Sequence, residues 1–107
     1  MGWSVEVKEA AVEQLQWFGK KTGRMLLRKA LEILGENPLA DSKQLKTLRP
    51  NPVAQRELRI WGKYRVLFSV DEKKDLVTII LVGEKRGNKL LVRGVEFSAH
   101  HEGNSTK

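Results

Sequence analysis

The pattern of hydrophobic and polar residues changes period along the chain, and the first change separates a strand from helices. Trp3, Val5 and Val7 alternate with polar residues, which is the period of a half-buried strand. After them, up to about residue 34, apolar residues recur every three or four positions, as on one buried face of a helix. The chain should therefore begin with one strand and continue into helices.

Two glycines divide the helical region. The first helix should run over about residues 9–18 and stop at Gly19, and the second should stop at Gly35. Thr22 stands where its hydroxyl group would cap the second helix. Two helices separated by about three residues pack as an antiparallel hairpin.

A polar linker with all three prolines of the chain follows, over about residues 36–55. Proline removes backbone donors and disfavours helix before it, so at most one helical turn is expected there, around 43–48. Beyond the linker, short runs rich in β-branched and aromatic residues predict strands, which cover about residues 56–61, 64–70, 76–83 and 89–97.

The order of these elements predicts an α+β domain of the type β-α-α-β-β-β, with a further strand at its end. The helix hairpin should cover one face of a small, mainly antiparallel, twisted sheet. The run 76–82 is nearly continuous in apolar residues, which predicts a central strand covered on both faces. Residues 1–97 should form this single domain, and residues 98–107, which have almost nothing to bury, a disordered tail.

Alternation also predicts where an unusual charge in the middle of a strand points. Val66 and Phe68 share the face that suits the helices, so Arg65 should point to the opposite face. A guanidinium group is permanently charged, and its planar fork suits phosphate oxygens. The alternative is a structural ion pair with a carboxylate of a neighbouring strand or turn: Glu57, Asp71 or Glu84.

The composition favours a negatively charged partner. The 107 residues include 20 Lys and Arg but 13 Asp and Glu, so the formal net charge is +7. Such a charge favours nucleic acid or an acidic protein. No apolar run approaches a membrane span, and the acidic, interrupted N-terminal stretch is no signal peptide, so the cytoplasm is the expected location. The chain has no cysteine, which excludes disulfides and thiolate metal sites.

Other basic residues are candidates for phosphate contacts. Arg56 and Arg59 precede Arg65 in the neighbouring strand. Lys85 and Arg86 flank a glycine-containing turn that lacks the spacing of a nucleotide-binding P-loop. A basic turn still suits a phosphate backbone, but solvated strand faces and hairpin tips carry such charges routinely.

A further basic group lies on the second helix, where Lys20, Arg24 and Arg28 would form one stripe; helix surfaces often carry such stripes without a function. The two histidines, His100 and His101, fall in the predicted tail, where neither is a fixed general base. No metal or cofactor is therefore expected. Phosphate chemistry would rest on arginine, lysine and carboxylate groups, or on the 2′-hydroxyl group of the substrate.

The whole pattern resembles the RelE/ParE family of toxins from bacterial type II toxin–antitoxin modules. The resemblance covers about residues 3–89 and rests on the helix hairpin, on "NPLADSKQLKTL", on "RELRIWGKYRVLFSVDEKK" and on "LVTIILVGEKRGNK", in that order. It implies a compact β-α-α-β-β-β fold and a cognate antitoxin that masks the basic face. Ribosome-dependent members cut mRNA in the ribosomal A site, where the 2′-hydroxyl group attacks the adjacent phosphate without a metal.

The resemblance also implies residue roles. Arg65 matches the family arginine at the scissile phosphate, and Arg59, with Arg56 less closely, falls where the family binds or activates RNA. Lys85 and Arg86 compete, within one residue of register, for the second catalytic arginine of the family. The catalytic residues expected are Arg65, Arg86 and Arg59, and the RNA-binding residues expected are Arg56, Lys85, Lys89, Arg24 and Arg28.

Two departures from the family keep other functions open. Ribonuclease members often have a C-terminal tyrosine that stacks on a base or helps proton transfer, whereas "LLVRGVEF" offers only Phe97, which could stack but has no proton to give. Glu57 lies where a positive charge would help RNA binding. The leading hypothesis is a ribosome-dependent mRNA endoribonuclease. The alternatives are a ParE-like inhibitor that acts by binding DNA gyrase, and a nucleic-acid-binding member without catalysis.

Overall fold

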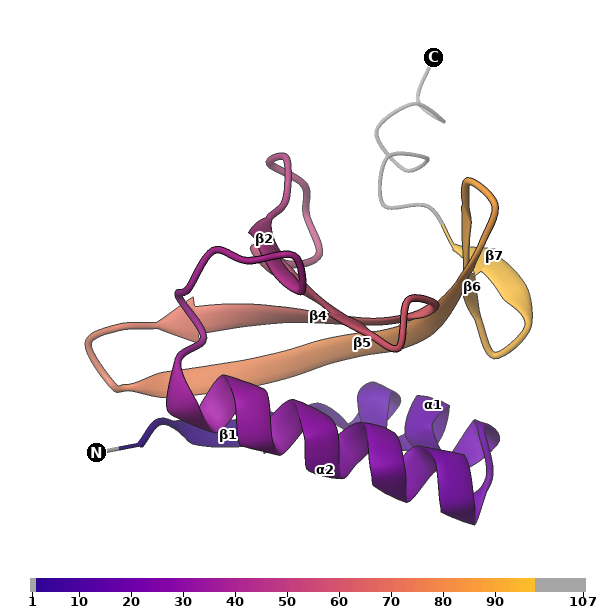
Figure 1. The fold of residues 1–107 in the computed structure, drawn as a ribbon, viewed down its shortest axis with the longest axis horizontal. Helices are drawn as coiled ribbons and strands as arrows, with labels where there is room; N and C mark the ends of the chain where they lie inside the picture. Colours follow the sequence, from indigo (N-terminus) through magenta and orange to yellow (C-terminus); the bar gives the residue numbers. More distant parts are fainter. Residues whose placement is uncertain (1, 98–107) are drawn as a thin grey trace.

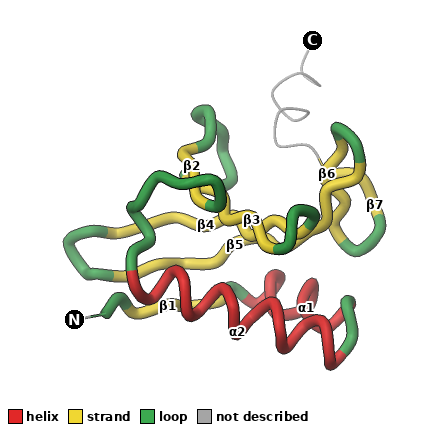
Figure 2. The backbone as a smooth tube through the Cα atoms, in the orientation of Figure 1, coloured by secondary structure: helices red, strands yellow, loops and turns green. Residues whose placement is uncertain are grey.

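The computed structural model describes residues 2–97 and has the predicted α+β architecture, with two helices on one side of a mainly antiparallel sheet (Figures 1 and 2). No helix among these residues is long and apolar enough to cross a membrane. The predicted tail and both histidines lie outside the described residues. The elements in chain order are β1 (Ser4–Val7), α1 (Glu9–Trp17), α2 (Lys20–Glu36), β2 (Leu45–Thr47), β3 (Arg56–Ile60), β4 (Tyr64–Asp71), β5 (Leu76–Arg86), β6 (Lys89–Val92) and β7 (Val95–Phe97).

The long strand β5 is central, as the sequence predicts. β4 pairs with it in antiparallel fashion along nearly its whole length. Its other edge is shared by two strands, because β1 runs parallel to residues 76–79 and β6 runs antiparallel to residues 84–86. The sheet continues through β4, β3 and β2 on one side and through β6 and β7 on the other.

Between β1 and β6, one backbone amide of β5 is reached by a side chain instead of a strand. The Val82 N–H donates a hydrogen bond of 2.7 Å to Oε1 of Gln14, a buried residue of α1. An unpaired buried amide destabilises a fold, so this glutamine completes the edge of the sheet and fixes α1 against it.

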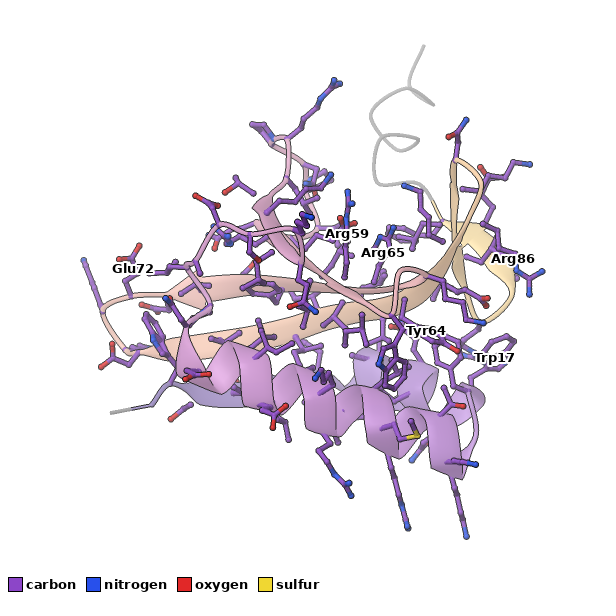
Figure 3. The ribbon with its side chains drawn as sticks, in the orientation of Figure 1. Trp17, Arg59, Tyr64, Arg65, Glu72 and Arg86 are labelled. Carbon is purple, nitrogen blue, oxygen red and sulfur yellow. The ribbon has the colours of Figure 1, made fainter. Side chains whose placement is uncertain are left out.

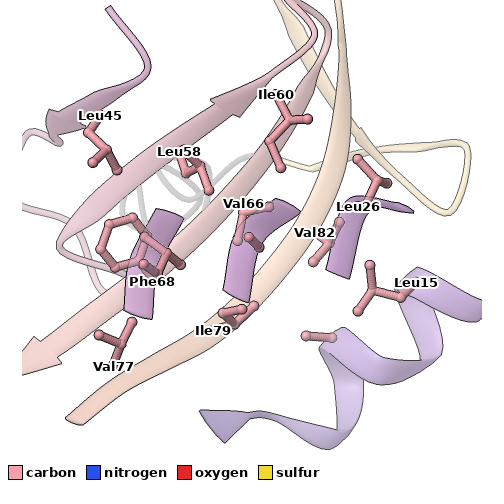
Figure 4. Packing of buried hydrophobic residues seen from close by; sticks show 13 residues of the cluster. Leu15, Leu26, Leu45, Leu58, Ile60, Val66, Phe68, Val77, Ile79 and Val82 are labelled. Carbon is pink, nitrogen blue, oxygen red and sulfur yellow. The ribbon is translucent and has the colours of Figure 1, made fainter. Parts of the chain in front are cut away.

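The main core lies between the helices and one face of the sheet (Figure 4). Alternation in β3 and β4 directs Leu58, Ile60, Val66 and Phe68 toward the helices, and all four are essentially inaccessible to solvent. Gly23 lets α1 and α2 approach closely, because a Cβ there would lie 2.4 Å from the Leu15 carbonyl oxygen. The cluster comprises Ala11, Leu15, Leu26, Ala30, Leu34, Leu45, Leu58, Ile60, Val66, Phe68, Val77, Ile79 and Val82.

Two predicted elements differ in the structure. The linker contains the edge strand β2 instead of a helical turn, because Leu45 buries its side chain in register with Leu58 of β3. The predicted strand 89–97 is a hairpin of β6 and β7, turned at Arg93 and Gly94. Both residues have positive φ, as in a two-residue hairpin loop.

The start of the second helix also differs. α2 begins at Lys20, so Thr22 lies inside its first turn and is no cap. Gly19 takes the N-cap position with a φ of 95°, a conformation that favours glycine, and its carbonyl group accepts a hydrogen bond from Gly23 N–H. The glycine that was expected to stop the first helix therefore also starts the second.

Replacing Gln14 with methionine removes the acceptor while keeping a side chain of similar length. We expect the free energy of unfolding to fall by about 1–3 kcal/mol, the usual cost of a buried amide without a partner. Urea denaturation followed by circular dichroism measures the change. Gln16→Met, at an exposed position of the same helix, is the matched control. Equal losses in the two variants would contradict this role of Gln14.

Candidate functional site

The face of the sheet opposite the helices, here called the open face, carries two arginines side by side. Arg59 of β3 and Arg65 of β4 are register partners, so their side chains leave the sheet on the same side. Figure 3 shows both of them on the side away from α1 and α2, whereas Tyr64 points toward the helices. The direction that alternation predicts for Arg65 is confirmed.

Arg65 is a fixed and nearly buried cation. Only 6% of the residue is exposed, and Nη1 donates hydrogen bonds to the carbonyl oxygens of Gly62 at 2.8 Å and Tyr64 at 3.1 Å. Its register partner in β5 is Gly83, which has no side chain to cover the guanidinium group. Burial lowers the pKa of Arg65 from its ordinary value; Glu57 acts against this shift.

One carboxylate lies among three cations on this face. Oε1 of Glu57 is 3.5 Å from Nε of Arg59 and 3.9 Å from Nζ of Lys46, and Oε2 is 3.9 Å from Nε of Arg65. The Nε atom of Arg65 is buried and has no hydrogen-bond partner within residues 2–97. Three cations around one carboxylate leave positive charge in excess, so the cluster is suited to a second anion.

A groove of about 430 Å³ adjoins this cluster, because Glu57 lines the groove as well. The linker after β2 forms one side of the groove, and the region around the β5–β6 turn forms the other. Leu67, Leu90 and Phe97 supply apolar surface, and Lys89 also forms an ion pair of 3.9 Å with Glu96. The basic residues that line the groove are Lys46, Arg49, Lys85 and Lys89.

The structure separates the two candidates of the basic turn. Lys85 lines the groove of the open face. Arg86 instead lies on the same side of β5 as Glu84, the register partner of the helix-facing Tyr64. Its Nε lies 3.6 Å from the Glu84 carboxylate. Figure 3 shows Arg86 pointing outward at the edge of the sheet, well apart from Arg65. Of the two residues, Lys85 is therefore the one that reaches the site.

Three other predicted RNA-binding residues lie away from the open face. Arg56 shares the helix-facing side of β3 and is buried, with hydrogen bonds to the Ala40 carbonyl, to Asp41 and to Thr47. These contacts fix the linker. Arg24 and Arg28 are exposed on α2, on the opposite side of the sheet from Arg65.

Two basic residues of the groove were missed by sequence reasoning. Lys46 and Arg49 lie in or beside β2, which the sequence analysis treated as linker. Had this strand been recognised, its pairing would have placed Lys46 opposite Glu57, on the open face. The sequence signal for this strand is weak, because three residues are too few to show the alternation of apolar and polar positions.

No protein-family model and no curated protein matches the chain. Solved structures do match it. The toxin–antitoxin complex RelBE2 from Mycobacterium tuberculosis superimposes with a TM-score of 0.68 at 22% identity, covering 79% of this chain and 93% of that chain. A free Escherichia coli RelE with two arginines mutated to alanine gives 0.60 at 25% identity, covering 78% and 83%.

The isolated E. coli RelE toxin gives a TM-score of 0.59 at 21% identity and covers 97% of this chain and 96% of that chain. All three structures therefore match over more than three quarters of this chain. The resemblance that the sequence predicts is therefore confirmed in the fold, and this chain has a RelE-like fold.

Proposed function

We propose that the protein is the toxin of a toxin–antitoxin module and cleaves mRNA on the ribosome. The observation that supports this proposal most strongly is the fixed guanidinium group of Arg65, which lies on the open face beside a groove with four basic residues. A permanently charged group that is already desolvated and oriented needs little reorganisation to stabilise new negative charge.

The reaction we propose uses the 2′-hydroxyl group of the RNA as its nucleophile. This oxygen attacks the adjacent phosphorus, the bond to the 5′-oxygen breaks, and a 2′,3′-cyclic phosphate forms. The proton lost by the 2′-hydroxyl is balanced by the proton that the leaving 5′-oxygen gains. Negative charge builds on the non-bridging phosphate oxygens during this step, and Arg65 would stabilise it.

The other cations would hold the RNA strand. Arg59 belongs to the same cluster as Arg65, and Lys85 lines the adjoining groove. Contacts from such residues to phosphates set the register of the strand without reading its sequence. We assign the second cationic position to Lys85 in preference to Arg86, because the ion pair of Arg86 with Glu84 lies away from the groove.

We infer that an antitoxin is the protein partner, since the RelBE2 toxin superimposed above was solved as a toxin–antitoxin complex. An acidic segment of such a partner that covered the open face would neutralise the cluster around Glu57 and block the groove. Inhibition would then follow from competition with RNA for the same cations.

Arg65→Ala should abolish cleavage while the fold is retained. Loss of one oriented donor to a developing negative charge typically lowers rates by about 10²–10³-fold. Mapping of mRNA 5′ ends in cells that express each protein measures the effect, and circular dichroism checks the fold. Equal cleavage by the two proteins would contradict the proposal. Growth arrest by wild type without any cleavage would favour a gyrase-directed toxin instead.

Lys85→Ala and Arg86→Ala test the assignment of the second cationic position. Removing one phosphate contact should weaken binding to an unpaired RNA and reduce the slope of log K against log salt by about 0.7. We expect this change for Lys85→Ala alone. Fluorescence anisotropy with a non-cleavable 2′-O-methyl oligonucleotide, over a series of salt concentrations, measures both quantities. If Arg86→Ala lost the same affinity and the same slope, Arg86 would also contact the RNA. The assignment of the second cationic position to Lys85 would then be wrong.

Glu57→Gln should strengthen RNA binding, because it removes a negative charge within 4 Å of three cations and keeps the shape of the side chain. Relief of about 1 kcal/mol of competing attraction corresponds to about a fivefold gain in affinity. The same anisotropy titration measures this gain. Unchanged or weaker binding would mean that Glu57 mainly orients the arginines for their ligand.

A further inference from the structure

The end of the molecule that carries the β3–β4 turn has a cluster of four aromatic side chains, here called the aromatic end: Trp17, Phe18, Trp61 and Tyr64. Their rings meet edge to face, with centroid distances of 5.3 Å for Trp17 and Phe18, 5.4 Å for Phe18 and Tyr64, and 5.9 Å for Trp61 and Tyr64. The residues come from the end of α1 and from the region between β3 and β4. Figure 3 shows Trp17 and Tyr64 at the same end of the molecule.

The two tryptophans of the cluster are half exposed, Trp17 at 49% and Trp61 at 51%. Apolar side chains of this size usually bury most of their surface, so two of them exposed in one cluster form a candidate binding surface. The rest of the cluster holds them in place. Phe18 and Tyr64 pack against the main core, and Gly94 of the β6–β7 hairpin lies against the Trp17 ring.

The backbone at Trp61 is strained. Its φ is 52°, a conformation that residues with a Cβ adopt at a cost, and Gly62 beside it has a φ of 77°. Arg93 and Gly94 have similar φ values at the β6–β7 hairpin, so this conformation belongs to the tight turn between two strands. Trp61 is half exposed at this turn.

The same turn is tied to the catalytic candidate. The carbonyl oxygen of Gly62 accepts the 2.8 Å hydrogen bond from Nη1 of Arg65. The residue that fixes the guanidinium group therefore directly follows Trp61 in the chain.

Two cations lie exposed around the aromatic end, and one of them, Arg93, forms an ion pair of 3.9 Å with Glu13 of α1, which is 58% exposed. Lys63 and Arg93 are each 57% exposed, and Nζ of Lys63 lies 5.1 Å from the centroid of the Tyr64 ring. Glu84, the carboxylate that pairs with Lys63, is only 16% exposed. Aromatic rings with cations beside them are typical of surfaces that bind unpaired nucleic acid, whereas an apolar protein segment would gain nothing from these cations.

We propose that Trp61, supported by the rest of the aromatic end, stacks on an unpaired nucleobase of the RNA strand whose phosphate contacts Arg65. The inference rests on the proposed function and adds a base contact to the phosphate contacts of the open face. Every base has a flat face, so this site would select unpaired over paired RNA without reading sequence.

Trp61→Leu and Trp61→Phe separate stacking from simple apolar contact. With an unpaired 2′-O-methyl oligonucleotide, Trp61→Leu should bind about tenfold more weakly than wild type, and Trp61→Phe should stay within about twofold. The matched control is Leu31→Ala, which shortens an exposed apolar side chain on α2 and should leave the affinity unchanged. Anisotropy titrations measure these affinities, and circular dichroism checks each fold.

An abasic oligonucleotide of the same length and charge provides the second arm. Wild type should bind it about tenfold more weakly, and Trp61→Leu should lose nothing further. If Trp61→Leu does not fold, the affinities of wild type for the unpaired and the abasic oligonucleotide still test whether a base contributes to binding. Equal binding of both by wild type, while Lys85→Ala binds less tightly, would overturn the stacking site and leave the proposed function standing. No RNA binding by wild type would overturn both.

Discussion

The two hydrogen bonds from Arg65 to the carbonyl oxygens of Gly62 and Tyr64 are the contacts on which the open face depends. They hold a charged group inside the protein, where desolvation opposes it, and they leave its Nε atom directed at Glu57. Gly83 keeps the neighbouring position of β5 free of a side chain. A charge confined in this way has little freedom to lose when an anion binds, and that is the property an anion site requires.

The same strand that places the charge also forms the core. In β4, the residues on one side of the pleat pack against the helices, while Arg65 and Leu67 lie on the other side. The helices therefore stabilise the sheet without covering the cationic cluster. The groove beside that cluster is formed by the linker and the last hairpin, which pack against a second hydrophobic cluster that includes Leu67.

Much of this arrangement could be predicted from the sequence, because β4 and β5 are long enough to show a period. Alternation alone gave the direction of Arg65, and the apolar run of β5 gave its central position. The two-residue turn at Arg93 was missed, because a short hairpin within an apolar run looks like one strand.

The remaining errors have the same origin: they concern contacts between segments that are distant in the sequence. The sequence does not decide on which side of β3 the Arg56 side chain lies. Its hydrogen bonds to the Ala40 carbonyl and to Asp41, in the linker, decide it. Lys85 and Arg86 differ by one position, and only the pairing of β5 with its neighbours assigns each to a face. The aromatic end joins α1 to the β3–β4 turn, which no local pattern indicates.

The central claim is that Arg65 itself contacts a phosphate group. The most direct test is nuclear magnetic resonance of the arginine Nε–Hε groups, with a non-cleavable 2′-O-methyl RNA added to the folded protein. We predict a clear shift of the Arg65 signal, with the signals of Arg24 and Arg28 on α2 unchanged. Shifts confined to α2, with Arg65 unmoved at saturating RNA, would contradict the account.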